Sequence, residues 1–163
     1  MAEPVPCILG VDPGLSGALA FYFPTHDRVM VQDMPVLAGR VEPYGLTEAI
    51  RQLRPTHAVI EQVATRPGQG ISSAFNFGEG CGVVRGVVAS LAVPVVFVTP
   101  ASWKRHFRLS QDKDESRKRA MDLFPNIAKE FARKKDDGRA EAALIARWFA
   151  DTSPLMRKAG EAA

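Results

Sequence analysis

The sequence predicts an α/β protein in which a five-stranded mixed sheet is flanked by helices. Three short apolar segments come first along the chain, and helical and strand-like segments alternate after them, in the order βββαβαβα. The 163 residues are 46% hydrophobic and 24% charged, which is typical of a soluble globular domain. We therefore expect a single domain over residues 1–163, with its core in 7–150 and a flexible tail at 153–163.

The first part of the chain predicts a hairpin of two buried strands, over residues 7–12 and 16–23. An apolar run ends on Asp12, passes through a Pro-Gly turn, and resumes as a second apolar run. A lone carboxylate at the end of a buried strand is costly to bury, so Asp12 should be paired, hydrogen-bonded or bound to metal. The alternative is a turn aspartate that only caps backbone N–H groups.

The later elements follow from the same patterns of apolar residues. In the strand expected over 57–63, an apolar run again ends on a carboxylate, Glu61. The other expected elements are strands at 28–34 and 95–99, helices at 46–53, 72–91 and 112–124, and a last alanine-rich helix that carries Asp137 and Glu141. Residues 102–108 interleave aromatic side chains with cations.

Small residues recur every four positions in the helix expected over 72–91. Gly78, Gly82 and Gly86 lie in its interior, and each costs up to about 1 kcal/mol of helix stability relative to alanine. A stripe of glycines allows another backbone to approach closely, which would offset that cost. One interpretation is packing against the protein's own sheet, and the other is contact with a second subunit.

Two carboxylates lie near the start of the last helix. Asp137 and Glu141 are four residues apart, so both lie on one helical face. Like charges at this spacing repel each other, so a cation is expected between them. The alternative is that Asp136 or Asp137 only caps the helix, which leaves Glu141 unexplained.

The positive charge of the chain is unevenly distributed. The net charge is +3, but residues 100–139 hold 12 of the 21 Lys and Arg residues and 7 of the 18 Asp and Glu residues. A basic segment on a nearly neutral body is typical of a protein that binds a polyanion. The alternative is a solvated helix surface with ion pairs between neighbouring turns.

Three motifs together resemble the RuvC-type Holliday-junction resolvases, which have a ribonuclease H-like fold. The resemblance is to the phage and organellar branch of this family and spans about residues 7–150. It implies a homodimeric, magnesium-dependent endonuclease that cuts symmetric strands of a four-way DNA junction. One departure is that the last two acids are four apart and end in Glu, where the bacterial pattern has two aspartates three apart. The motifs are Val11-Asp12-Pro13-Gly14 with Ser16-Gly17, Ile60-Glu61-Gln62, and Asp137-Gly138-Arg139-Ala140-Glu141-Ala142.

The four acids suit the chemistry that this resemblance implies. Hydrolysis of a phosphodiester needs a nucleophilic water and neutralised charge on the phosphate, which two Mg²⁺ ions about 4 Å apart supply. Carboxylate oxygens are the ligands that Mg²⁺ prefers, and Mn²⁺ is expected to substitute. We expect Asp12 to bridge the two ions, Glu61 and Glu141 to flank them, and Asp137 to act as a ligand or as the base that orients water. No His-rich or Cys-rich zinc spacing competes.

The predicted DNA contacts come from the basic segment and from the loop after Glu61. Lys104 and Lys113 resemble the family's phosphate-contacting lysines, and Arg117 follows them in the basic helix. Arg66 and Gln69 are expected beside the bases at the cut. The predicted dimer interface is the glycine stripe at Gly78, Gly82 and Gly86.

Other functions fit parts of the sequence. The Asp12–Gly17 segment also resembles the phosphate loop of actin-like kinases and ATPases, but a second such loop and a second lobe are absent from the sequence. A junction-binding protein without catalysis, or a nuclease acting on another branched or hybrid nucleic acid, remains an alternative. No small-molecule cofactor is expected.

A cytoplasmic location is expected, in a bacterium or a phage-infected cell, with an organellar origin left open. The N-terminus lacks the features of a signal peptide. The longest apolar run, residues 87–98, is broken by Pro94 and is shorter than a membrane span, so no membrane partner is expected. Cys7 and Cys81 are predicted to be reduced core thiols.

Overall fold

The computed structural model describes residues 5–65 and 67–156. Five strands form one sheet: β1 (Ile8–Asp12), β2 (Ala18–Phe23), β3 (Arg28–Asp33), β6 (His57–Glu61) and β7 (Val95–Val98). Their order across the sheet is β3-β2-β1-β6-β7. The first three strands pair antiparallel, whereas β6 pairs parallel with β1 and β7 pairs parallel with β6. The mixed sheet predicted from the sequence is confirmed.

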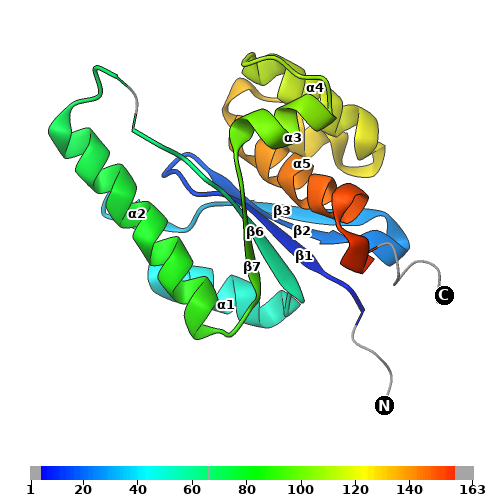
Figure 1. Ribbon diagram of the computed structural model, residues 1–163, viewed down its shortest axis with the longest axis horizontal. Helices are drawn as coiled ribbons and strands as arrows, with labels where there is room; N and C mark the ends of the chain where they lie inside the picture. Colours follow the sequence, from blue (N-terminus) through cyan, green and yellow to red (C-terminus); the bar gives the residue numbers. More distant parts are fainter. Residues whose placement is uncertain (1–4, 66, 157–163) are drawn as a thin grey trace.

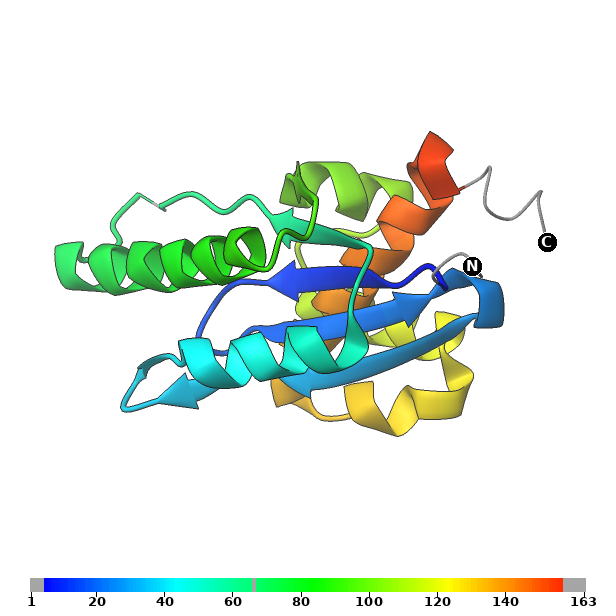
Figure 2. The same cartoon turned by 90° about the horizontal axis from the view of Figure 1, so that it is seen from below.

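Helices cover both faces of this sheet (Figure 1). One face carries α1 (Pro43–Leu53) and α2 (Ile71–Ser90). The other carries α3 (Pro100–His106), α4 (Lys113–Leu123) and α5 (Asp137–Thr152). Figure 2 shows the strands lying between the two helical layers. The described residues also include three 3₁₀ segments: η1 (Pro24–His26), η2 (Pro125–Phe131) and η3 (Lys134–Asp136).

The alternation of side chains along β1 decides which face its carboxylate lies on. Leu9 and Val11 belong to the apolar cluster beneath α1 and α2. Ile8 belongs to the cluster on the α5 side. Because side chains alternate between the faces of a strand, Asp12 shares the α5 face with Ile8. The same count along β6 puts Glu61 on the α5 face with Val59.

Two glycines allow α5 to lie against β1 and the turn before β2. A Cβ added to Gly10 would lie 2.9 Å from the Cβ of Ala146 and would overlap the carbonyl oxygen of Ala142. A Cβ added to Gly138 would lie 2.5 Å from the carbonyl oxygen of Ser16. The helix therefore approaches the strands more closely than any side chain at these two positions would permit. This approach brings the first turns of α5 to the carboxyl end of β1.

Several elements differ from the sequence-based expectation. The expected ends of strands and helices are displaced by up to three residues, and α1 begins earlier because Glu42 caps it through the amides of Tyr44 and Gly45. The short hairpin of β4 (Val36–Leu37) and β5 (Arg40–Val41) was not expected. Its strands are too short to show an alternating pattern. The segment at 102–108 lies mostly in α3, where Thr99 accepts a hydrogen bond from the Ser102 amide as the N-cap.

The end of the described chain packs against the core. Ser153 is buried, and Met156 contacts the apolar cluster on the α5 side. The remaining residues of the expected tail, 157–163, lie outside the described residues. Cys7 and Cys81 are buried free thiols. Within residues 5–65 and 67–156, no helix is both long and apolar enough to cross a membrane.

Candidate active site

Three carboxylates lie close together at the carboxyl edge of the sheet. Asp12 ends β1 and Glu61 ends β6, and the preceding residues of these parallel strands, Val11 and Ile60, are partners in register. Glu141, in the second turn of α5, is 6% exposed, as is Glu61. Burial, together with the charges of Glu61 and Glu141, raises the pKa of Asp12 to about 7. The predicted convergence of these three acids is therefore present in the structure.

The pKa of Glu61 is also raised, chiefly by burial. A hydrogen bond from Trp103 opposes this shift, while the charge of Glu141 adds to it. The positive charges of Lys104 and Lys113 lower the pKa of Glu61. At Asp12 and Glu61, burial and the neighbouring negative charges therefore outweigh the nearby cations, so both pKa values are raised.

Helix α3 provides two partners for these acids. The indole Nε1 of Trp103 donates a hydrogen bond to Glu61 Oε1 at 2.8 Å. The Nζ atom of Lys104 lies 3.3 Å from Glu141 Oε1. Trp103 was not predicted from the sequence to be part of the site, and Lys104 was predicted to contact DNA. In the structure Lys104 is only 7% exposed, so little of its side chain is open to a partner.

Lys113, the first residue of α4, lies beside the fourth predicted acid. Its ammonium forms an ion pair with Asp137. Partial burial lowers the pKa of Lys113, but the hydrogen bond to Asp137 and the charges of Glu141 and Asp12 raise it overall. Its side chain is still 58% exposed. Lys113 can therefore neutralise the cluster and remain accessible to a phosphate.

Asp136 and Asp137 have different partners. Asp136 is buried, and it accepts hydrogen bonds from the backbone amide and the guanidinium of Arg133. The guanidinium of Arg133 holds the pKa of Asp136 below its ordinary value. Asp137 instead faces Lys113 at the start of α5. Asp136 therefore caps η3 and makes no side-chain cap hydrogen bond to α5, whereas Asp137 pairs with Lys113 beside the cluster. The role of Asp137 as a metal-site acid stays a prediction.

The oxygens at this edge suit a hard divalent cation in their chemistry. Asp12, Glu61, Asp137 and Glu141 offer carboxylate oxygens only, which is the donor type that Mg²⁺ prefers. Glu141 Oε1 is buried and accepts no hydrogen bond, although Lys104 lies nearby. Among the residues that the structure describes, no three His, Cys, Asp or Glu side chains are arranged to hold a metal ion directly. Cation binding would therefore require the carboxylates paired with lysines to turn towards Asp12.

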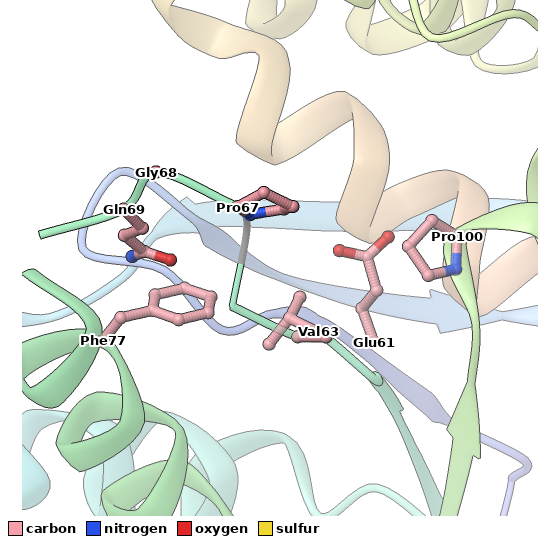
Figure 3. A pocket seen from close by; sticks show the side chains of 8 residues that line it. Glu61, Val63, Pro67, Gly68, Gln69, Phe77 and Pro100 are labelled. Atoms are coloured by element: carbon pink, nitrogen blue, oxygen red, sulfur yellow. The ribbon is translucent and has the colours of Figure 1, made fainter. Parts of the chain in front are cut away.

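A cavity of about 560 Å³ lies beside Glu61 (Figure 3). Glu61 and Pro100 line one side of it, and Gln69 and Phe77 line the other. The Nε2 atom of Gln69 lies 3.4 Å from the Ser73 hydroxyl. Gln69 thus lines the same cavity as Glu61, and its contact with bases stays a prediction. The companion prediction, Arg66, lies outside the described residues.

Arg117 has a different environment from the other predicted DNA contacts. Its side chain is 13% exposed and forms an ion pair with Asp114. Its guanidinium also donates to the backbone carbonyl of Ala132 at 2.8 Å. These contacts join α4 to the end of η2, which favours a structural role for Arg117. Its contact with DNA stays a prediction.

The glycine stripe of α2 faces away from the sheet. Gly78, Gly82 and Gly86 are exposed, and a Cβ added to any of them would meet no described atom within 4 Å. The helix instead buries Gly80, Cys81, Val84 and Val88. The interpretation that the stripe packs against the protein's own sheet is therefore wrong. A contact with a second subunit stays a prediction.

Comparison with solved structures identifies the fold. The chain is similar to Thermus thermophilus RuvC in complex with a Holliday-junction substrate, with a TM-score of 0.63 and 16% identity over 91% of this chain and 96% of that one. A second T. thermophilus RuvC structure gives a TM-score of 0.61 and 17% identity over 89% and 95% of the two chains. The yeast mitochondrial Holliday-junction resolvase Ydc2 gives 0.55 and 15% identity over 100% and 87%.

These likenesses show a ribonuclease H-like fold. Within that class it is the fold of the RuvC-type resolvases, as the motifs of the sequence predicted. Neither a protein-family model nor a curated protein matches the sequence.

Proposed function

We propose that this protein is a metal-dependent endonuclease that resolves four-way DNA junctions by paired, symmetric nicks. The observation that carries the proposal is the convergence of Asp12, Glu61 and Glu141 at one edge of a RuvC-type sheet. Carboxylates are costly to bury together unless a cation balances them. The proposal gives that arrangement a chemical purpose, because hydrolysis of a phosphodiester needs clustered acids of this kind.

Each acid has a proposed role in hydrolysis. When bound, two Mg²⁺ ions would supply a nucleophilic water and neutralise charge on the phosphate. Asp12, whose pKa is raised by both Glu61 and Glu141, would hold the ions together with these two acids. Asp137 would orient the attacking water or serve as a further ligand. Mn²⁺ would replace Mg²⁺ in this oxygen-rich set.

The lysines have a matching role. Lys104 and Lys113 each pair with an acid in the cluster. On binding DNA, a phosphate would compete for these ammonium groups and release Glu141 and Asp137 towards the cations. Lys113 is the more exposed of the two, so we propose that it contacts phosphate first. Gln69 and the cavity beside Glu61 would face the nucleotides next to the cut.

The exposed glycine stripe supports a two-fold dimer. A junction with two-fold symmetry is most simply cut at paired positions by an enzyme that shares the symmetry. Gly78, Gly82 and Gly86 offer a smooth helix surface on which a second copy of α2 could lie closely. We propose that this contact sets the two acid clusters on the same side of the junction.

A junction-binding protein without catalysis is the second candidate. It is favoured by the ion pairs of Glu141 with Lys104 and of Asp137 with Lys113, because these pairs neutralise the acids without metal. The two candidates differ in whether the cluster takes up a cation and cuts DNA.

Incubation with an end-labelled four-way junction and Mg²⁺ tests the proposed function. The wild-type protein should give paired nicks at symmetric positions, whereas Asp12→Asn should cut at less than a few per cent of the wild-type rate and bind the junction at least as tightly. Asp33→Asn is the matched control, because Asp33 ends β3 and pairs with Arg139 outside the cluster. Junction binding without nicks by the wild type would support the second candidate. Preferential cutting of a hybrid nucleic acid, or of a branched nucleic acid other than the four-way junction, would identify a different substrate.

A further inference from the structure

Trp103 contacts a proposed metal ligand from inside the protein. The side chain is fully buried, and its Nε1–H donates to Glu61 Oε1 at 2.8 Å. An indole has one polar group, which is a donor and never an acceptor. The ring of Trp103 is therefore oriented to donate to the carboxylate of Glu61, and this hydrogen bond fixes one of the two oxygens of Glu61.

The backbone around Trp103 is well suited to holding that contact. Glu61 pairs in register with Val98, the last residue of β7. Thr99 then caps α3, and Pro100 occupies its first turn. Both features define the start of a helix closely. Trp103 thus reaches Glu61 from the neighbouring strand through a short and well-defined connection.

The same turn of α3 reaches a second acid. The Nζ atom of Lys104 lies 5.2 Å from the centroid of the Trp103 ring and 3.3 Å from Glu141 Oε1. Replacing the indole would therefore remove the hydrogen bond to Glu61 and alter the cation–π contact with Lys104. Trp103 links Glu61, on the sheet, to the side of the cluster formed by α5.

We propose that Trp103 is a positioning residue that fixes one oxygen of Glu61 and so directs the other towards the bound cation. This inference rests on the proposed function, since it assigns Glu61 to a cation site. Hydrogen bonds to metal ligands orient the ligand, and their loss commonly lowers metal affinity by about 10- to 100-fold. A tryptophan that only filled the core would affect stability and leave the cation affinity of the folded protein unchanged.

The chain offers a matched control, because it contains only two tryptophans. Trp148 lies in α5 about two turns beyond Glu141, is partly buried and packs against the apolar cluster on the α5 side. Trp103→Phe keeps an aromatic ring and removes the donor, and Trp148→Phe makes the same chemical change outside the site. Ca²⁺ and Mn²⁺ binding to each purified variant is measured by calorimetry in the absence of DNA. We expect Trp103→Phe to bind both ions about 10-fold more weakly or worse and Trp148→Phe to match the wild type.

Junction cutting provides a second readout with the same pair of variants. Raising the Mg²⁺ concentration should restore much of the rate of Trp103→Phe, because the defect lies in cation affinity. A folded Trp103→Phe protein that binds Ca²⁺ and Mn²⁺ like the wild type would overturn the inference while leaving the proposed nuclease intact. A wild-type protein that binds neither ion would overturn the inference together with the proposed function.

Fluorescence keeps the inference testable if Trp103→Phe fails to fold. In the Trp148→Phe variant, Trp103 is the sole indole, so its emission reports on the contact with Glu61. Saturation with Ca²⁺, verified by calorimetry, should change that emission. Unchanged emission on saturation would show that Trp103 does not sense the cation site and would contradict the proposed role.

Discussion

Glycines on the two sides of this sheet differ in how closely they are packed. At Gly10 and Gly138, an added Cβ would overlap backbone atoms where α5 lies against β1 and the turn before β2. At Gly78, Gly82 and Gly86, an added Cβ would meet no described atom within 4 Å. The first group permits a close approach inside the molecule, and the second leaves a smooth surface outside it. The same residue type therefore builds the acid cluster on one side and exposes a potential interface on the other.

The difference shows why the two sides depend on glycine for separate reasons. The carboxylates of Glu141 and Asp12 interact. Moving α5 outward by the size of a methyl group would draw them apart. No such displacement follows from filling a position on the outer face of α2. Substitutions on the α5 side should thus affect the fold and the site together, whereas substitutions on α2 should affect association.

The largest expected effect follows Gly10→Ala. The new methyl group would overlap the carbonyl oxygen of Ala142, and neither backbone can yield without moving α5. We expect a loss of about 4 kcal/mol or more in the free energy of unfolding, at the upper end for overpacked cores. Urea denaturation followed by circular dichroism measures this change.

Gly14→Ala is the control at a nearby glycine that has room for a methyl group. Gly14 lies just beyond the end of β1, and its added Cβ would come no nearer than 3.8 Å to other atoms. Its stability should stay within about 0.5 kcal/mol of the wild type. Equal stability of the Gly10→Ala and Gly14→Ala variants would show that α5 adapts to the methyl group.

The next effect concerns the acids that the close approach brings together. Burial raises the pKa of Asp12 from 3.8 to about 7, so the folded protein retains a proton that the unfolded chain releases above about pH 4. The stability that Asp12 contributes is therefore fullest below pH 4 and is lost as the pH rises to 7. In EDTA, Asp12→Asn should be more stable than the wild type by about 2 kcal/mol at pH 8, after allowance for solvent screening, and equal to it near pH 4.

Urea denaturation at pH 4, 6 and 8 checks this prediction. Asp33→Asn is a control of opposite sign, because the hydrogen bond from Arg139 lowers the pKa of Asp33. A lowered pKa stabilises the folded protein above the unfolded value and loses that contribution in acid. The Asp33→Asn variant should therefore be less stable than the wild type at pH 8. A difference between Asp12→Asn and the wild type that does not vary with pH would refute the assignment of the titration to Asp12.

The sheet and its acids could be predicted from the sequence because each depends on local patterns. The apolar runs that end on Asp12 and Glu61 identify two strand ends, and alternation puts both side chains on one face. The four-residue spacing of Asp137 and Glu141 identifies their helical face. The hairpin of β4 and β5 escaped prediction because two-residue strands have no period.

The partners of the acids could not be predicted, since they depend on how α3 and α4 pack. Trp103 lies 42 residues beyond Glu61 in the chain, and no spacing connects them. Lys104 and Lys113 belong to a basic segment that predicts surface cations. In the structure they pair with Glu141 and Asp137. The cap formed by Thr99 and Pro100 was visible in the sequence and would have indicated α3.

On α2, Gly82→Leu tests association directly. A leucine at the centre of the stripe would keep two copies of α2 from close contact, and a stable interface normally buries about 800 Å² per partner. We expect sedimentation to show a dimer for the wild type and a folded monomer for the variant. The monomer should bind the junction and lose the coordination between its two nicks. A wild-type monomer at micromolar concentration, or a dimeric Gly82→Leu protein, would contradict the proposed interface.

The smallest expected effect follows Gly82→Ala, and its sign should depend on protein concentration. In a monomer, alanine at this exposed helical position stabilises the fold by up to about 1 kcal/mol, because glycine has the greater backbone freedom to lose. In a dimer joined through the stripe, the same methyl group would separate the helices and weaken the association that stabilises the folded state by mass action. Thermal unfolding of both proteins at nanomolar and high micromolar concentrations distinguishes the two contributions. The variant should be the more stable protein when dilute and should lose that advantage when concentrated, because only the wild type gains fully from dimerisation. If Gly82→Ala is more stable than the wild type by the same amount at both concentrations, two copies of α2 do not associate through their outer faces. The difference between Gly82 and Gly10 would then be a difference in packing within one molecule.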